Sequence, residues 1–270
     1  MMEALRYEWV RIRTIRSTIW LSVIALVFGV GLSFLVSMGI SFSFNSSEAP
    51  VGEDLAGIGP GVVTQFASIG LPYFVAYILA MIGVFAWGHE YRHGMIRATL
   101  TALNSRTASW VAKFLVVGLW VVFVGVLTML GSLLAGLVWL ADDPVRLVTG
   151  ATAGAAVRTL VYTVLLTWVA AAFTALTRNQ TAALVVLFLW PLAVENVIAA
   201  VFQLVPALRS HAELTRFLPF NAADRIVDQT AEATSVFGEP LSLVGALMIF
   251  GGVAALGMAA SLALFHRRDA

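Results

Sequence analysis

FLVVGLWVVFVGVLTMLGSLLAGLVWL, the sequence from Phe114 to Leu140, contains no charged residue. An α-helix needs about 20 apolar residues to cross the hydrocarbon core of a bilayer, so this stretch is long enough to span a membrane. The whole chain has the same character, because 60% of its residues are hydrophobic and only 11% are charged. These proportions exclude an ordinary soluble domain and indicate an integral membrane protein.

Other apolar stretches of similar length lie on both sides of this one. The expected spans run from Ile19 to Phe42, Ile69 to Trp87, Phe114 to Leu140, Ala155 to Leu176, Thr181 to Val205 and Leu241 to Phe265. They are continuously apolar and lack the alternation of membrane β-strands, which favours helices. The expected fold is an all-α membrane protein with six transmembrane helices, which form a single domain over residues 1–270.

The 16 lysine and arginine residues gather mainly on one side of these spans. They occupy the N-terminal tail, the connection between the second and third spans, and the C-terminus, whereas most acidic residues fall in the other connections. The positive-inside rule assigns the basic side to the cytoplasm. We therefore expect a multi-pass protein of the cytoplasmic (inner) membrane with both termini inside. The absence of cysteine excludes disulfides and thiolate metal ligands.

Residues 1–18 combine apolar and basic positions at helical spacing. The apolar positions are Leu5, Trp9, Ile12 and Ile15, and the basic positions among them include Arg6, Arg13 and Arg16. This pattern predicts an amphipathic helix on the membrane surface, with Trp9, Arg13 and Arg16 in contact with membrane lipid. The alternative is a frayed basic tail that only fixes the orientation.

Two connections on the opposite side carry proline and glycine. Residues 43–68 are rich in Ser, Gly and Pro, which predicts an irregular, solvated loop. The fifth span is interrupted at Trp190-Pro191, and residues 206–240 mix short apolar pieces with charge and proline. We expect short re-entrant or outer-surface helices over 206–240, and a plain extracellular loop is the alternative.

The polar segment 88–113, between the second and third spans, admits two interpretations. One is a zinc site, because His89-Glu90-x-x-His93 places two imidazoles on one helix face with a carboxylate that could act as general base. A membrane-embedded zinc protease would use His89, Glu90 and His93 in this way. The sequence offers no third ligand on the same side of the membrane, because His211 is expected outside and His266 is far along the chain. Our prediction for this chain is therefore no metal site.

The second interpretation follows from the order of residues after the second span. Glu90-Tyr91-Arg92-His93-Gly94 precedes a short apolar and basic piece, and Asn104-Ser105-Arg106 follows before the third span. Over its whole length the chain resembles the type 2 ABC transporter permeases, in which an acidic-aromatic-x-x-Gly step leads to a short coupling helix. It departs from that pattern at Met95, where Thr is frequent, and at Asn104, where Pro is frequent.

The resemblance implies a permease subunit of an ATP-driven exporter. Its partners would be two copies of an ABC ATPase subunit, which hold ATP and Mg, and a second permease subunit, identical or related. This chain has no phosphate-binding Gly-x-x-x-x-Gly-Lys-Ser/Thr motif, and we expect it to be a transport subunit with no enzyme activity, cofactor or nucleic-acid partner of its own. The residues expected to couple to the ATPase are Glu90, Tyr91, Gly94, Met95, Ile96, Arg97, Leu100 and Arg106. Replacing Glu90 or Arg97 is expected to uncouple transport with little loss of folding, whereas the alternative is that the basic residues only hold topology.

Glu195 is the only acidic residue inside an expected span. A carboxylate at membrane depth is costly and is by default a functional candidate. We predict a path for an amphipathic, lipid-like or drug-like substrate along Glu195, Trp190, Phe34 and Tyr77. Alternatively, Glu195 pairs with Arg158 or Arg209, or it lies in water beyond the end of the span. A stand-alone carrier or a structural membrane protein is a further alternative for the whole chain.

Overall fold

The computed structural model describes residues 1–44, 54–64, 74–96, 99, 105–141, 145–227 and 241–267. Within these ranges the regular structure is entirely helical. The long helices are α2 (Arg16–Phe44), α4 (Phe74–Arg92), α6 (Arg106–Leu140), α7 (Gly150–Thr177) and α11 (Leu243–Arg267), and a further span, Gln180–Leu204, is built from three consecutive pieces. Six helical segments in this part of the chain are thus long and apolar enough to cross a membrane, as expected for an all-α membrane protein. The first residues of the expected second span, 69–73, lie outside the described residues.

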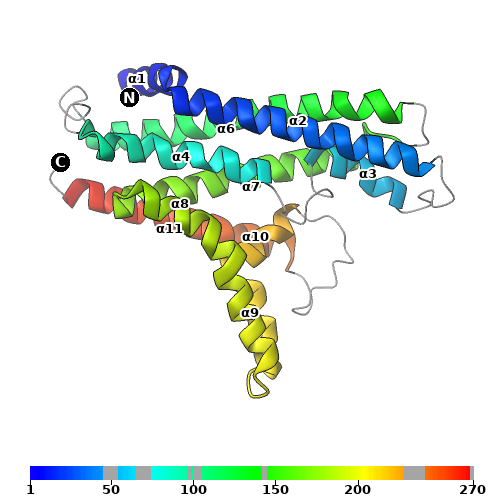
Figure 1. The fold of residues 1–270 in the computed structure, drawn as a ribbon. Coiled ribbons are helices and arrows are strands. Elements are labelled where there is room, and N and C mark those ends of the chain that lie inside the picture. Colours follow the sequence, from blue (N-terminus) through cyan, green and yellow to red (C-terminus); the bar gives the residue numbers. More distant parts are fainter. Residues whose placement is uncertain are drawn as a thin grey trace.

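The long helices lie side by side in one bundle, and α1 and the C-terminal end of α11 are at the same end (Figure 1). At this end the start of α6 meets the end of α11, where Thr107 Oγ1 lies 3.0 Å from His266 Nε2. An even number of spans returns the chain to the side from which it started, as observed. The basic residues predicted to share one side, such as Arg92 and Arg106, therefore lie at one end of the bundle.

Helix α4 runs through the middle of the bundle and is buried on most of its surface. It packs closely on α7, because a Cβ atom at Gly83 would lie 2.6 Å from the backbone oxygen of Thr167. Glycine thus allows two helix backbones to approach each other, as small residues do in membrane bundles. Helices α2 and α11 bury only a narrow face and expose large apolar side chains such as Leu35, Met248 and Leu256. Such an apolar exterior fits a lipid environment.

The expected irregular loop over 43–68 contains a helix, so that part of the prediction is wrong. Helix α3 (Asp54–Thr64) spans 11 residues despite Pro60 within it. Its C-terminal half is buried against α6 and α7, including Val62, Val63 and Thr64. Tertiary burial of this apolar half overrides the local Gly and Pro signals from which a loop was predicted.

The fifth candidate span bends where the sequence predicted an interruption. Its first part, α8 (Gln180–Leu189), lies in the bundle, and a π-helical turn (Trp190–Val194) follows at Pro191. Proline removes a backbone donor, and π-bulges are frequent sites of helix kinks. The next helix, α9 (Glu195–Leu204), points away from the bundle, and the 3₁₀ helix η2 (Arg209–Phe217) packs against it.

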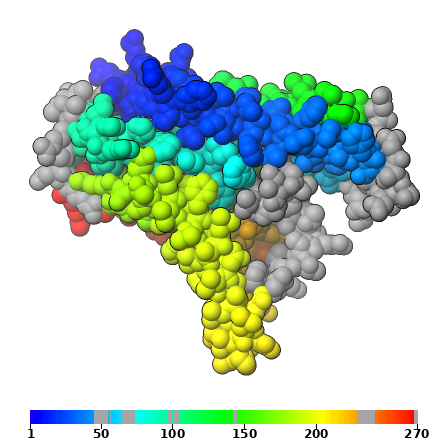
Figure 2. Space-filling view, viewed as in Figure 1, coloured from blue at the N-terminus to red at the C-terminus, as the bar shows by residue number. Residues whose placement is uncertain are grey.

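We call residues Glu195–Phe217 the arm. Figure 2 shows the arm standing clear of the rest of the molecule. Helix α10 (Pro219–Val227) then returns to the bundle and packs on α7 and α11. The short helices expected between the last two spans therefore exist as η2 and α10, and residues 228–240 lie outside the described part of the chain.

Candidate functional site

Helix α1 (Met2–Thr14) precedes α2 and packs mainly on the start of α6. Ile15 joins the two helices in an extended conformation, with φ −74° and ψ 119°, so the helical path is broken there. The buried face of α1 is formed by Ala4, Glu8 and Ile12, which are spaced four residues apart. A carboxylate therefore occupies the centre of the face that packs on the bundle.

Glu8 belongs to a buried cluster of four charged side chains from three helices, which we call the charge cluster: Glu8 and Arg11 of α1, Glu90 of α4 and Lys113 of α6. The Lys113 ammonium donates to Glu8 Oε1 at 2.8 Å and to Glu90 Oε1 at 2.7 Å. Arg11 donates to Glu8 Oε2 at 3.0 Å, to Glu90 and to the backbone oxygen of Ala86. The exposed fraction of the Lys113 side chain is 1%.

The charge cluster is electrically neutral, because two acids face two bases. Buried ions are tolerated when partners replace the lost hydration, and removing one partner leaves an uncompensated charge. The second oxygen of Glu90, Oε2, has no hydrogen-bond partner among the described residues. Glu90 is therefore held by its charge partners, and its environment depends on α1 staying docked.

Several aromatic side chains pack next to the charge cluster. The Lys113 ammonium is 5.1 Å from the centre of the Trp87 ring, within range of a cation–π interaction. Trp87 is fully buried and packs against Phe114 and Phe265, which brings the end of α11 into the same region. Tyr91 stacks on Trp87, and the Arg178 guanidinium lies 5.5 Å from the Tyr91 ring. Four other helices, α1, α6, α7 and α11, thus converge on one end of α4.

The segment after α4 begins with a sharp turn at Gly94. Gly94 has φ +64°, a left-handed conformation that glycine adopts without strain. Met95 is half exposed and Ile96 is partly buried against the Trp87 group. Of the other expected coupling residues, Arg97 and Leu100 lie outside the described residues.

The same segment is tied to α1 and to the far end of the chain. Thr99 Oγ1 is buried and lies 3.3 Å from the Tyr7 hydroxyl of α1. Ser105 caps α6 by accepting from the Ala108 N–H at 3.3 Å. Arg106 donates to the backbone oxygen of His266 at 3.4 Å. Residues 93–105 therefore connect α4 to α6, two helices that the charge cluster also links to each other.

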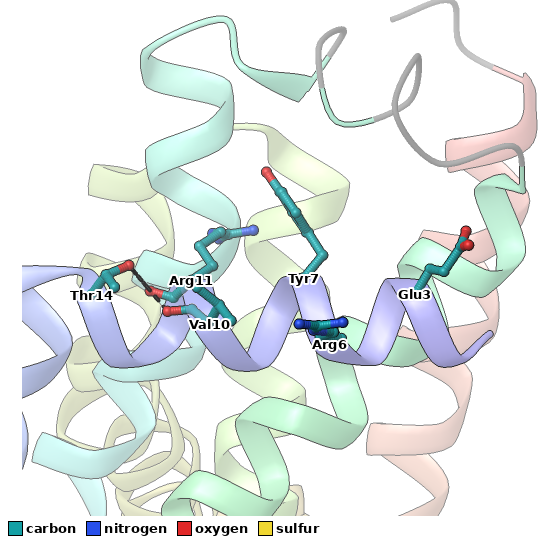
Figure 3. A pocket seen from close by; sticks show the side chains of 6 residues that line it. All are labelled: Glu3, Arg6, Tyr7, Val10, Arg11 and Thr14. Atoms are coloured by element: carbon teal, nitrogen blue, oxygen red, sulfur yellow. Dashed lines mark hydrogen bonds between the residues drawn. The ribbon is translucent and has the colours of Figure 1, made fainter.

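The outer side of α1 borders a hollow of about 530 Å³ (Figure 3). Its lining residues are Glu3, Arg6, Tyr7, Val10, Arg11 and Thr14. Arg11 and Tyr7 therefore line the hollow while they also contact buried partners on α4 and on the segment after it. Trp9, which was expected to face lipid, is partly exposed and packs edge-on against Trp120 at 5.8 Å. Arg13 and Arg16 are exposed.

The two histidines of the zinc pattern are placed apart from the carboxylate between them. His89 Nε2 lies 3.4 Å from Ser17 Oγ, and His93 is exposed with its ring 6.1 Å from that of His89. Glu90 faces Arg11 and Lys113 instead. The described residues contain no group of three His, Cys, Asp or Glu side chains that could hold a metal ion.

Glu195 is buried at the base of the arm. Its carboxylate accepts hydrogen bonds from the backbone N–H groups of Phe220, at 3.0 and 3.1 Å, and Asn221, at 2.8 Å, and from Trp190 Nε1 at 3.2 Å. The first N–H groups of a helix have no partner within the helix, so Glu195 satisfies those of α10 from a distant element. Neither Arg158 nor Arg209 appears among these contacts, and Arg209 donates to the backbone oxygen of Gln203.

The structure brings together only part of the expected substrate path. Trp190 contacts Glu195, and Tyr77 stacks on Phe188 at 5.6 Å and lies within electrostatic range of Glu195. Phe34 instead packs against Trp139 of α6, at 5.6 Å.

The sequence did not suggest that Glu8, Arg11 and Lys113 act together with Glu90. One local signal was available, because Glu8 shares a helix face with Ala4 and Ile12 and so interrupts an apolar stripe. A charge in such a stripe indicates a buried partner, although it does not identify which helix supplies it.

The sequence matches no protein-family model and no curated protein sequence.

Proposed function

We propose that this chain is the membrane-spanning permease of an ATP-driven ABC exporter, and that residues 90–106 transmit the movement of a separate ATPase subunit to the bundle. The proposal rests on the charge cluster, which joins α1 to α4 and α6, the two helices on either side of residues 93–105. A force applied to residues 93–105 would act on Glu90 at one end and on Lys113 at the other. Because both side chains also hold α1, these helices would respond as one body.

The surface available to an ATPase is the exposed part of this connection. Met95 offers an exposed apolar side chain at its start. An apolar side chain that enters a groove on a soluble partner, with basic residues such as Arg92 at the rim, is a common mode of helix recognition. ATP and Mg would be held by two copies of that ATPase subunit.

The proposed orientation places the charge cluster at the cytoplasmic face of the inner membrane. Both termini would then be inside, and α1 would lie along the cytoplasmic leaflet with Trp9, Arg13 and Arg16 near lipid headgroups. The arm and α10 would lie toward the outer half of the membrane. The arm exposes Val197, Val201 and Leu204, and a second permease subunit would cover such an apolar surface.

The proposed cargo is amphipathic or lipid-like and would pass between two permease subunits. Trp190, Tyr77 and Glu195 lie in one region on the side of the arm, where an apolar cargo could meet a small number of polar groups. Phe34 would contact cargo only from the other side of the bundle, near Trp139.

Copurification tests the class of protein directly. The tagged full chain, cross-linked in its native membrane and purified, is expected to bring with it an ATPase that contains a phosphate-binding loop. If no such ATPase copurifies, the proposal is wrong.

Substitution of Met95 tests the coupling surface without disturbing the buried cluster. Met95→Glu is expected to release the ATPase and to abolish transport-linked ATP hydrolysis in proteoliposomes, because a charge enters an apolar contact. Met2→Glu is the matched control, since Met2 is also exposed and lies on α1 at the same end of the bundle. Equal ATPase binding by the Met95→Glu variant and the unmodified protein would exclude Met95 from the contact.

A further inference from the structure

A small cavity lies inside the bundle, between α3, α4, α6 and α7. Its volume is about 20 Å³, and its lining includes four threonines: Thr64 of α3, Thr128 of α6, and Thr159 and Thr163 of α7. Each of these side chains is at least nine-tenths buried. The remaining lining is apolar, formed mainly by α4 and α6, so the threonine hydroxyls are the polar groups of the cavity.

Three of these hydroxyls already donate their hydrogen atom to a backbone carbonyl oxygen. Thr64 donates to the Pro60 oxygen at 2.8 Å, Thr128 to the Val124 oxygen at 2.9 Å, and Thr163 to the Thr159 oxygen at 2.6 Å. A hydroxyl has one hydrogen and two lone pairs, so each of these oxygens can only accept a further hydrogen bond.

The fourth hydroxyl differs from the other three. Thr159 Oγ1 is buried and has no hydrogen-bond partner among the described residues. Burying a hydroxyl that lacks a partner is costly, so native structures rarely leave one unsatisfied. The cavity therefore combines one free donor with a set of acceptors.

We propose that this cavity binds a single water molecule, which accepts a hydrogen bond from Thr159 and donates to two of the other threonine oxygens. A water molecule needs a cavity of about 10–15 Å³ and between two and four polar partners, and both conditions are met here. A metal cation fits the same lining poorly, because no acidic side chain among the lining residues would balance its charge.

The water would connect three elements of the bundle, α3, α6 and α7. Thr64 is the last residue of α3, and the two α7 threonines face it from the core of the bundle. A shared water thus fixes the buried end of α3 to α6 and α7.

Hydroxyl-radical footprinting by X-ray pulses tests this proposal, because radicals form from bound water and oxidise the adjacent side chains. In water labelled with a heavy oxygen isotope, Leu79 is expected to gain labelled oxygen although it is only 2% exposed. Ile82 is the internal control, since it lies on the same helix, is 1% exposed and does not line the cavity. Oxidation of Leu79 no higher than that of Ile82 would overturn the proposal.

A double variant separates the water from the cavity itself. Thr128→Val combined with Thr159→Val keeps the shape of both side chains and removes two of the polar partners. The oxidation of Leu79 is expected to fall to the level of Ile82, while helix content and the elution volume in detergent stay unchanged. If the variant fails to fold, Thr159→Val alone is used with the same readout, and unchanged Leu79 oxidation in a folded variant would contradict the assignment.

Discussion

Two carboxylates, Glu90 and Glu195, are equally buried in this protein, with exposed fractions of 2% and 1%, but they are stabilised in different ways. Glu90 faces an ammonium and a guanidinium that come from two other helices. Glu195 faces backbone N–H groups at the start of α10 and an indole N–H from the turn just before it.

The difference determines what each carboxylate can do. A charge neutralised by side chains of separate helices connects those helices. Its distance to the neutralising groups changes whenever these helices move relative to each other. A charge neutralised by a helix N-terminus fixes one short element in place and is insensitive to the rest of the bundle. Glu90 is therefore suited to transmit movement, whereas Glu195 is suited to hold the base of the arm.

Removing the shared cation should have the largest effect. Lys113→Met leaves Glu8 and Glu90 buried beside Arg11 alone, and loss of one partner from a buried ion pair costs about 3–5 kcal/mol. We expect a large decrease in the thermal unfolding temperature of the purified protein in detergent, accompanied by proteolytic release of α1.

A double variant distinguishes lost charge balance from lost packing. Lys113→Met combined with Glu90→Gln removes one charge of each sign, so it should recover part of the stability. If the double variant is no more stable than Lys113→Met, then packing around Lys113, and not charge balance, explains the loss. Because Glu90 is buried in the charge cluster, its replacement should reduce stability as well as coupling, whereas the sequence alone suggested little loss of folding.

Removing the Glu195 carboxylate should have a smaller and local effect. Glu195→Ala leaves the N–H groups of Phe220 and Asn221 without their acceptor, at a cost of about 1–3 kcal/mol. Hydrogen exchange should accelerate in residues 218–222 and stay unchanged around Thr99 and α1.

Glu195→Gln is the matched control, because it keeps a carbonyl oxygen that can accept from one N–H group while removing the charge. Its exchange rates should lie between those of the alanine variant and the unmodified protein. Faster exchange throughout α1 in either variant would contradict the separation of the two regions.

The sequence was sufficient for the spans because each one is a long and predominantly apolar stretch, of which Phe114 to Leu140 is the clearest case. It was insufficient for the charge cluster because Glu8, Glu90 and Lys113 are far apart in the chain and meet only when three helices pack. The wrong loop prediction for residues 43–68 has a related cause, since α3 is held by burial of Val62 and Val63 against other helices. Topology can be inferred from local composition, whereas contacts between helices depend on the packed bundle.

The smallest effect is expected at the edge of the charge cluster, where Tyr7 reaches Thr99. Tyr7→Phe removes this hydrogen bond and keeps the ring, so the free energy of unfolding should fall by only about 0.5–1.5 kcal/mol. The segment after α4 should nevertheless become more mobile relative to α1, because this hydrogen bond joins the two directly.

A pair of spin labels can measure this mobility. The chain has no cysteine, so Met95→Cys and Met2→Cys provide unique sites for the two labels. Tyr7→Phe should broaden the distance distribution between the labels while leaving the mean unfolding temperature almost unchanged. An unaltered distribution would mean that the charge cluster alone holds the connection to α1, and Glu90 would then carry the whole link between the two regions.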